Sequence, residues 1–355
     1  FPAASAGRPM KPLRFAIFGT GFWARAQLAA WRELGGVECV AVHDRDQARA
    51  EAFVRELGVA GAFRDPAELL ATARPDFVDI ITQVDGHRPL ALLCARRRVP
   101  CICQKPMAAT LRDARAMVAA FARTRTPLYI HENWRWQAPL RALIGTLRAG
   151  VIGRPFRARF TMISGFDVWA GQPALRELEQ FILMDLGVHV LDTARACLGE
   201  AHSVACQVHR TLAPGVRGEN VATLLLAMGP ARTSVVIELA YAGTPLEREC
   251  FPQTLAFVEG PRGSVELAPD YRLRVTTTGG THSQRHPPPH HAWADPRYAV
   301  AQASMVPCLR DLRAGLRGGR PPETTGADQL RTMELVFAAY QSARLDRVVH
   351  LRRPR

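Results

Sequence analysis

Lys105 is unusual for its residue type in this sequence. The 46 lysines and arginines include only two lysines, Lys11 and Lys105. An arginine cannot release its proton near neutral pH, whereas a lysine can, and a compact ammonium fits beside a substrate oxygen. Lys105 follows a short apolar run and precedes Pro106, which we expect to fix the turn that aims it. We predict a catalytic role for Lys105 at the carboxyl end of a parallel strand, with an ordinary surface lysine as the alternative.

A second set of chemical groups lies on an apolar segment. Asp185, His189 and Asp192 are spaced at i, i+4 and i+7, which places them on one face of an α-helix. Buried carboxylates and imidazoles need polar partners, and histidine is well suited to proton transfer near neutral pH. We predict that Asp185 and His189 are catalytic and that Asp192 binds substrate or orients its neighbours. A buried structural histidine is the alternative.

A glycine-rich turn near the N-terminus has the G-x-G-x-x-A spacing of a dinucleotide-binding turn. Gly19 would permit the tight turn, Gly21 would let the backbone approach the pyrophosphate, and Ala24 would let the next helix pack closely. Asp44 could accept hydrogen bonds from the adenosine ribose, which favours NAD, although it could also merely cap a helix. Arg45 keeps NADP open, because a guanidinium can pair with a 2′-phosphate.

These groups need a scaffold, and the first third of the chain alternates short apolar runs with longer stretches of helical period. That alternation is typical of β-α-β units and a parallel sheet. We predict strands at 13–18, 37–43, 77–81, 101–103 and 128–130. We predict helices at 24–34, 47–57, 66–73, 89–97 and 111–123. The expected fold is an α/β Rossmann domain, a doubly wound parallel sheet, over residues 13–132 after an N-terminal extension at 1–12.

Beyond residue 133 the rhythm changes, because strand-like segments follow one another closely and are separated by Gly and Pro turns. The predicted strands are 157–163, 203–211, 221–228, 233–241, 254–259, 264–267 and 272–278. The predicted helices are 173–183, 185–198, 300–317 and 326–345. The segment 279–295, which contains His-Pro-Pro-Pro-His-His, is predicted to be a loop. A second, α+β domain is expected over residues 133–355.

The composition argues against several classes of protein. No apolar run reaches the roughly 20 residues that cross a bilayer, and residues 1–8 do not resemble a secretory signal. The formal charge of +14 is dispersed along the chain, without the interleaved aromatic residues of a nucleic-acid site. The eight cysteines lack zinc-ligand spacing, and the histidines of 279–295 lack acidic partners, so we expect no metal and reduced thiols in a cytoplasmic protein.

The order of these motifs resembles the Gfo/Idh/MocA family of glucose-fructose oxidoreductase and inositol dehydrogenase-like enzymes. The residues that carry the resemblance are 19–24, 82–87, 104–106, 133–135, 185–192 and 338–343. The resemblance implies a Rossmann domain, a C-terminal domain with an open, mainly antiparallel sheet, and homodimers or homotetramers that associate through that sheet. It matches Lys105 to the lysine of a Glu-Lys-Pro motif, and Asp185 and His189 to residues at the substrate.

Gln104 departs from the family pattern, because a glutamate that faces the nicotinamide ribose usually stands there. A glutamine keeps hydrogen bonding but brings no negative charge. With this resemblance, the predicted cofactor-binding residues are Gly19, Gly21, Phe22, Trp23, Ala24, Asp44, Arg45, Thr82, His87, Gln104 and Lys105.

The sequence therefore predicts an NAD(P)-dependent oxidoreductase that transfers a hydride between nicotinamide and a secondary alcohol or ketone of a sugar, inositol or related polyol. His189 would remove the hydroxyl proton, and Lys105, oriented by Asp185, would stabilise the negative oxygen. Lys105 could instead carry the proton. The predicted substrate-binding residues are Trp134, Arg135 and Asp192.

Two other functions stay open at this point. One is an enzyme of the same family that retains NAD and uses transient oxidation for glycoside cleavage or epimerisation. The other is a dinucleotide-binding regulator without turnover, which would have no use for the trio Lys105, Asp185 and His189.

Overall fold

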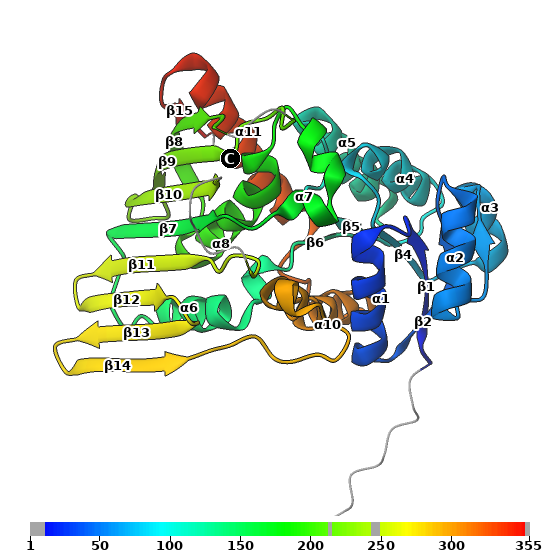
Figure 1. Cartoon of the computed structure of the whole chain (residues 1–355), viewed down its shortest axis with the longest axis horizontal. Helices are drawn as coiled ribbons and strands as arrows, with labels where there is room; N and C mark the ends of the chain where they lie inside the picture. Colours follow the sequence, from blue (N-terminus) through cyan, green and yellow to red (C-terminus); the bar gives the residue numbers. More distant parts are fainter. Residues whose placement is uncertain (1–10, 212–214, 243–248, 352–355) are drawn as a thin grey trace, which may run out of the picture.

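The computed structural model describes residues 11–211, 215–242 and 249–351. Most of the predicted extension, residues 1–10, lies outside this part of the chain. Two sheets stand side by side, each with its helices, and the chain passes from the first to the second after residue 131 and later returns (Figure 1).

The first sheet has six parallel strands in the order β3-β2-β1-β4-β5-β6, which is the doubly wound order of a dinucleotide-binding domain. The strands are β1 Leu13–Phe18, β2 Val37–His43, β3 Ala62–Phe63, β4 Phe77–Ile80, β5 Cys101–Gln104 and β6 Leu128–His131. The helices are α1 Phe22–Leu34, α2 Gln47–Leu57, α3 Pro66–Ala73, α4 Val84–Arg96 and α5 Leu111–Thr124. The predicted α/β Rossmann fold class is confirmed.

Both faces of this sheet are buried, as the continuous apolar run of β1 requires. Phe15 and Ile17 pack in one apolar cluster with residues of α1 and α2, and Ala16 and Phe18 pack in another with residues of α3, α4 and α5. Alternate residues of β1 are thus apolar on both faces, and a layer of helices covers each face.

A helix from the far end of the chain completes the first of these two layers. Helix α10, Met305–Leu316, packs against α1, and its apolar residues join the cluster of Phe15 and Trp31. The Rossmann sheet is thus covered in part by residues that lie well beyond the predicted boundary at 132.

The second sheet has nine strands in the order β14-β13-β12-β11-β7-β10-β9-β8-β15. Its strands are β7 Arg157–Ser164, β8 Ala201–His209, β9 Val221–Met228, β10 Thr233–Tyr241, β11 Leu255–Gly260, β12 Gly263–Ala268, β13 Arg272–Thr277, β14 Gly280–Arg285 and β15 Val349–His350. Among the described strands of this sheet, β7 and β10 are the one pair that runs parallel. This sheet confirms the predicted mainly antiparallel second domain.

The helices of the second half are α6 Ala138–Arg148, α7 Val168–Gly171, α8 Val188–Leu198, α9 Ala299–Gln302 and α11 Gly326–Leu345. Helices α6, α8 and α11 pack on one face of the nine-stranded sheet, against β12, β7 and β8 respectively. The other face carries exposed apolar side chains such as Ile163 and Leu225. None of the helices in the described ranges is long and apolar enough to cross a membrane.

Several predicted elements were wrong. The segment 279–295 is not all loop, because β14 pairs with β13 in an exposed hairpin. The predicted helix 173–183 is instead a short 3₁₀ turn, Pro173–Glu177, and Leu183 already begins a π-helical segment. Helix α4 starts at Val84 and contains Pro89, whereas the predicted helix begins at the proline. Helix α6 was missed.

Candidate active site

A cavity of about 1000 Å³ lies at the carboxyl ends of the Rossmann strands. One wall comes from residues just beyond the ends of four neighbouring strands, namely Gly19, Asp44, Thr82 and Lys105. The opposite wall comes from the second half of the chain, through residues 171–180, the π-helical segment Leu183–Gly187, His189 and Phe251. Open α/β sheets bind ligands at this edge, and here both halves of the chain enclose the space.

The glycine turn leaves room for a phosphate at the start of α1. Gly19 has a φ of +98°, and a Cβ there would lie 2.6 Å from the carbonyl oxygen of Ile81, so only glycine fits. A Cβ at Gly21 would meet nothing within 4 Å, because this residue faces the cavity. No side chain caps α1, and Ala24 is fully buried beneath it. The free space, the glycine and the uncapped helix N-terminus fit the pyrophosphate of a dinucleotide.

Asp44 is held in place by its neighbours on the cavity rim. Its Oδ2 accepts hydrogen bonds from the backbone N and the hydroxyl of Thr20, at 2.9 and 2.8 Å, and its Oδ1 accepts one from the backbone N of Asp46. Burial opposes the charge, but these bonds keep the pKa of Asp44 below its usual range. The N-cap of α2 is Asp46, not Asp44, so the carboxylate of Asp44 is not a helix cap.

The other predicted cofactor residues surround the same cavity. Phe22, Trp23, Arg45, Thr82 and His87 all line it. The ring of His87 is buried and bridges two backbone carbonyls, those of Thr82 and Pro106, at 3.1 and 3.0 Å. His87 therefore joins two loops of the wall, and the other four side chains reach the open space more directly.

Gln104 lines the cavity, but its amide is engaged by the protein. Its Nε2 donates hydrogen bonds to Oε1 of Gln27 at 2.6 Å and to Nδ1 of His131 at 3.0 Å, and its Oε1 accepts one from the backbone N of Lys105. Gln27 in turn donates to both oxygens of the buried Asp79. Gln104 is thus the cavity end of a series of buried hydrogen bonds that runs through Gln27 to Asp79.

Lys105 and Asp185 form an ion pair inside the cavity. The ammonium Nζ lies 3.0 Å from Oδ1 of Asp185 and 3.1 Å from its backbone oxygen. On the other side the hydroxyl of Tyr241, from β10, donates to Oδ2 of Asp185 at 3.4 Å. Lysine and aspartate come from different halves of the chain, 80 residues apart, so the pair closes the site across the two sheets.

His189 lies in the first turn of α8, and its ring contacts protein groups on two sides. Its Nδ1 lies 2.6 Å from Oε1 of the buried Glu132, and its ring stacks on Trp134 with centroids 4.2 Å apart. Burial, and next the positive charge of Lys105, hold the pKa of His189 well below its usual value. The histidine is therefore neutral, which is the form that can accept a proton.

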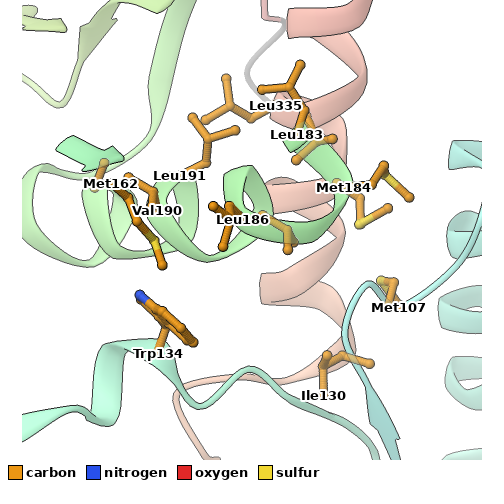
Figure 2. Packing of buried hydrophobic residues seen from close by; sticks show 14 of the residues in the cluster. Met107, Ile130, Trp134, Met162, Leu183, Met184, Leu186, Val190, Leu191 and Leu335 are labelled. Atoms are coloured by element: carbon orange, nitrogen blue, oxygen red, sulfur yellow. The ribbon is translucent and has the colours of Figure 1, made fainter. Parts of the chain in front are cut away.

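The segment that carries Asp185 is not an α-helix. Leu183–Gly187 is π-helical, and α8 continues from Val188. Single π turns occur often at functional sites. Leu183, Met184 and Leu186 anchor the turn in the apolar core beside Leu335 (Figure 2). The π turn changes the relation between Asp185 and the residues that follow, yet Asp185 and His189 both line the cavity.

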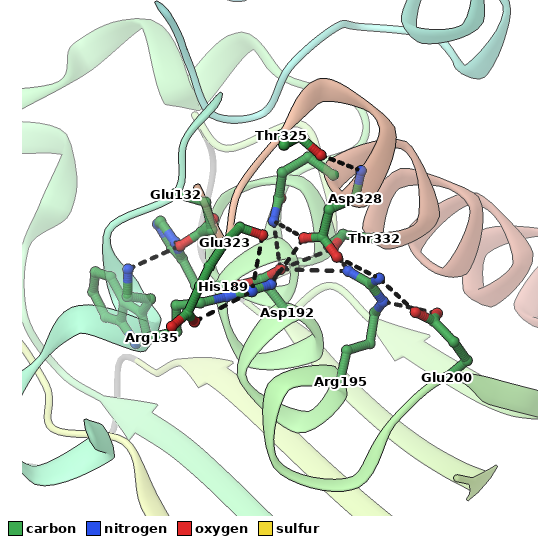
Figure 3. Close-up of polar contacts among 12 residues, drawn as sticks. Glu132, Arg135, His189, Asp192, Arg195, Glu200, Glu323, Thr325, Asp328 and Thr332 are labelled. Atoms are coloured by element: carbon green, nitrogen blue, oxygen red, sulfur yellow. Dashed lines mark hydrogen bonds and ion pairs between the residues drawn. The ribbon is translucent and has the colours of Figure 1, made fainter. Parts of the chain in front are cut away.

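Arg135 and Asp192, the other predicted substrate-binding residues, pair with each other. Arg135 donates two hydrogen bonds to the carboxylate of Asp192, at 2.7 and 2.5 Å, and a third to Asp328. Both are buried, neither lines the cavity, and they form the centre of an ionic cluster with Arg195 and Glu323 (Figure 3). Neither of these two predicted substrate contacts lies on the cavity, whereas Trp134 lines it beside His189.

Sequence reasoning missed Glu132 and Tyr241, which contact His189 and Asp185 respectively. The only available signal for Glu132 was an acid at the end of an apolar strand. Within the described residues, no group of three or more His, Cys, Asp and Glu side chains is arranged to hold a metal ion. His291 of the histidine-rich segment contacts Glu33 of α1 instead.

Comparisons with known proteins agree with this architecture. Residues 13–131 match the model of an oxidoreductase family with an NAD-binding Rossmann fold, and residues 140–266 match the Gfo/Idh/MocA C-terminal domain. The chain is 44% identical to the D-apiose dehydrogenase of Paraburkholderia graminis, over 97% of this chain and 91% of that protein. It is 41% identical to the D-apiose dehydrogenase of Rhizobium rhizogenes, over 96% and 98%.

A solved structure gives the same result. The crystal structure of an oxidoreductase from Agrobacterium radiobacter in complex with NAD⁺, L-tartaric acid and magnesium superposes with a TM-score of 0.92 at 39% identity. The match covers 96% of this chain and 98% of that one.

Proposed function

Since the chain belongs to the Gfo/Idh/MocA family and is an NAD-dependent sugar dehydrogenase, we propose that its substrate is D-apiose or an aldose of similar size. The proposal rests on two relatives named D-apiose dehydrogenase, at 44% and 41% identity over nearly the whole chain. The cavity supports it, because polar groups from both halves of the chain converge there beside the Rossmann turn.

We propose that Lys105, Asp185 and His189 carry out the proton chemistry. When NAD is bound, the nicotinamide accepts a hydride from the carbinol carbon of the sugar. Lys105 stabilises the oxygen that becomes negative, and Asp185 fixes the ammonium through the 3.0 Å ion pair. Neutral His189 accepts the hydroxyl proton as general base. The observation that carries this assignment is that these three groups line one cavity although they come from two domains.

NAD would be held by the turn around Gly19 and Gly21 at its phosphates and by Asp44 at its adenosine ribose. The Thr20 and Asp46 donors already fix the Asp44 carboxylate on the cavity wall, so binding of the ribose would cost little further side-chain entropy. Arg45 also lines this end of the cavity, which keeps NADP as a weaker alternative.

The test is turnover of NAD⁺ with a panel of D-apiose, D-ribose, D-glucose and myo-inositol, followed by the absorbance of reduced nicotinamide. D-apiose is expected to give the highest kcat/KM. A higher kcat/KM with myo-inositol would refute the proposal that the substrate is D-apiose or a similar aldose. A cofactor that stays bound through dialysis and is regenerated each turnover would point to the NAD-retaining alternative.

The roles of the individual residues are tested with variants on the best substrate of that panel. Lys105→Met and His189→Ala are each expected to lower kcat at least about 100-fold. Lys11→Met is the matched control, because Lys11 is exposed and remote from the cavity. Wild-type turnover in both test variants would refute the assignment.

We also propose a homodimer or homotetramer that associates through the open face of the nine-stranded sheet. Ile163 on β7 and Leu225 on β9 are 44% and 53% exposed there, on the same face on either side of β10. Light scattering on the wild type and on Leu225→Glu tests this, since a charge in the interface would shift the mass toward the monomer.

We also propose a cytoplasmic location. It is supported by free thiols at Cys39, Cys94, Cys101, Cys103, Cys197, Cys206 and Cys308.

A further inference from the structure

Glu132 is a completely buried carboxyl group next to the proposed general base. It follows β6, and its Oε1 accepts a hydrogen bond from the backbone N of Trp134 at 3.0 Å and lies 2.6 Å from Nδ1 of His189. Its Oε2 is buried and has no hydrogen-bond partner in the part of the chain that the structure describes. A buried carboxyl group with so few donors is costly when ionised, and the chain places it against the histidine of the active site.

The ring of His189 has one orientation. The indole of Trp134 lies nearly parallel to it, at 22°, and Trp134 is itself tied to Thr254 by a hydrogen bond from Nε1. Because Nδ1 is engaged by Glu132, Nε2 is the ring nitrogen left for the cavity that His189 lines. The two nitrogens therefore face different partners, a carboxyl group behind and the substrate space in front.

We propose that Glu132 is the final acceptor of the substrate's proton, which reaches it through a change of tautomer in His189. With Glu132 ionised, Nδ1 carries the hydrogen and donates it to Oε1, and Nε2 is a bare lone pair. When Nε2 takes the hydroxyl proton, the hydrogen on Nδ1 moves to Oε1. Glu132 is a positioning residue in this scheme, because it acts through His189 and does not touch the substrate.

Atoms and charges balance in this step. The substrate O–H bond breaks and an Nε2–H bond forms, while the Nδ1–H bond breaks and an Oε1–H bond forms. The carbinol carbon gives its hydride to NAD⁺, so the alcohol is oxidised to a carbonyl and the cofactor is reduced. Glu132 changes from carboxylate to carboxylic acid, and His189 is neutral before and after. The proton returns to water by the reverse tautomer change after the product leaves.

The surroundings explain why the proton would not stay on the imidazole. A positively charged His189 would be buried beside Lys105, and both effects keep its pKa low. Burial, and next the negative charge of Asp192, raise the pKa of Glu132 to about 8, so its carboxylate holds a proton that reaches it, and the ionised form that starts the step is populated as the pH rises toward 8. The titratable and charged groups that act on this pair from the elements around it are Lys105, His131, Arg135, Asp185, Asp192 and Cys308.

The inference rests on the proposed function of His189, but not on the identity of the sugar. One test therefore uses no substrate. Nitrogen chemical shifts of ¹⁵N-labelled histidine identify the tautomer of His189, with its signal assigned by comparison with His189→Asn. In the wild type, His189 is expected to stay neutral and to change from the Nε2–H tautomer to the Nδ1–H tautomer as the pH rises. Conversion to a charged imidazolium at pH 7 would overturn the relay.

The second test compares turnover in Glu132→Gln and Glu132→Asp. The amide introduced by Glu132→Gln can still accept the Nδ1–H bond and orient the ring, but it cannot take up a proton. We expect kcat to fall at least about tenfold, and the ionisation near neutral to alkaline pH to disappear from the profile of kcat. Glu132→Asp restores a carboxylate and is expected to bring back the pH dependence at a lower rate.

Glu323→Gln is the matched control. Glu323 is a carboxylate of the ionic cluster around Arg135, 3.8 Å from that guanidinium, and its side chain pairs within the described residues with Arg135 and Arg141, not with His189. This variant should keep the wild-type pH profile and the pH-dependent tautomer of His189.

The outcomes separate the possible failures. If Glu132→Gln lowers only the melting temperature and keeps the wild-type profile, Glu132 is structural and the relay is refuted. If the wild type turns over no sugar of the panel, the proposed function fails, whereas the tautomer measurement still decides the role of Glu132. Cofactor binding measured by fluorescence shows that each variant is folded.

Discussion

Gln104 donates a hydrogen bond of 2.6 Å to Oε1 of Gln27, and through it the rim of the cavity is linked to a buried carboxylate. Gln27 uses its own amide hydrogens on both oxygens of Asp79, at 2.9 and 2.7 Å. Gln27 therefore cannot turn its amide round to offer a donor to residue 104. This arrangement requires a donor at residue 104, which a glutamine supplies and a glutamate would not.

Gln104→Glu should therefore destabilise the protein. A carboxylate at 104 would face the oxygen of Gln27 and add a second negative charge to the chain that ends at Asp79. We expect the free energy of unfolding to fall by about 1–3 kcal/mol, measured by urea denaturation at neutral pH. Gln284→Glu, on the exposed strand β14, is the control and should change it by less than about 0.5 kcal/mol. Equal stability of Gln104→Glu and the wild type would contradict this account.

The stability of the protein should depend on pH through Asp79. Burial raises the pKa of Asp79 to about 6 from the usual 3.8. The folded chain thus keeps a proton that the unfolded chain has already lost, so this group makes the free energy of unfolding decrease between about pH 4 and pH 6. In Asp79→Asn this contribution, about 3 kcal/mol across that range, should be missing. Denaturation curves at several pH values compare the two slopes, and parallel slopes would show that Asp79 does not titrate there.

Arg135 should matter for stability and not for binding of the sugar. Arg135→Lys keeps the positive charge but cannot form two parallel hydrogen bonds to Asp192. We expect a loss of about 1–3 kcal/mol in the free energy of unfolding with an unchanged KM for the sugar. Arg141→Lys, whose partner Glu323 is nearer the surface, should cost less than about 1 kcal/mol. A large rise in KM without loss of stability would mean that Arg135 contacts the substrate.

Asp44 should decide the preference between the two cofactors. Asp44→Ala removes the acceptor for the ribose hydroxyls and the negative charge that opposes a 2′-phosphate, while Arg45 remains nearby. The ratio of kcat/KM for NADP⁺ to that for NAD⁺ is expected to rise at least about tenfold. Asp46→Ala serves as the control, because Asp46 caps α2 without lining the cavity. It should lower stability and leave the ratio unchanged.

The parts of the site that could be predicted are those written in short, local patterns. The turn at Gly19 and the lysine after β5 need only a strand end and a few residues, and the structure places both on the cavity. Glu132 and Tyr241 could not be found this way. Glu132, just after β6, meets His189 of α8 only when the two halves of the chain pack together, and Tyr241 meets Asp185 only when β10 folds beside the π turn, 56 residues away in sequence.

Asp192 shows a second limit of sequence reasoning. The predicted shared face of Asp185, His189 and Asp192 requires one continuous α-helix. In the structure Leu183–Gly187 is a π turn, in which hydrogen bonds span five residues instead of four. Periodicity alone cannot reveal such a turn. Asp192 points instead to Arg135, a partner 57 residues away that no local pattern identifies.

The packing of α10 against α1 also bears on how the protein is made. During synthesis the Rossmann strands emerge first, yet one layer over them is incomplete until residue 316 has been translated. Until then the apolar side chains that meet Met305 and Leu309 have no cover, and this face of the nucleotide-binding half stays open until α10 has been made. We therefore expect a fragment that stops at residue 132 to aggregate, because one face of its sheet lacks the cover that α10 provides.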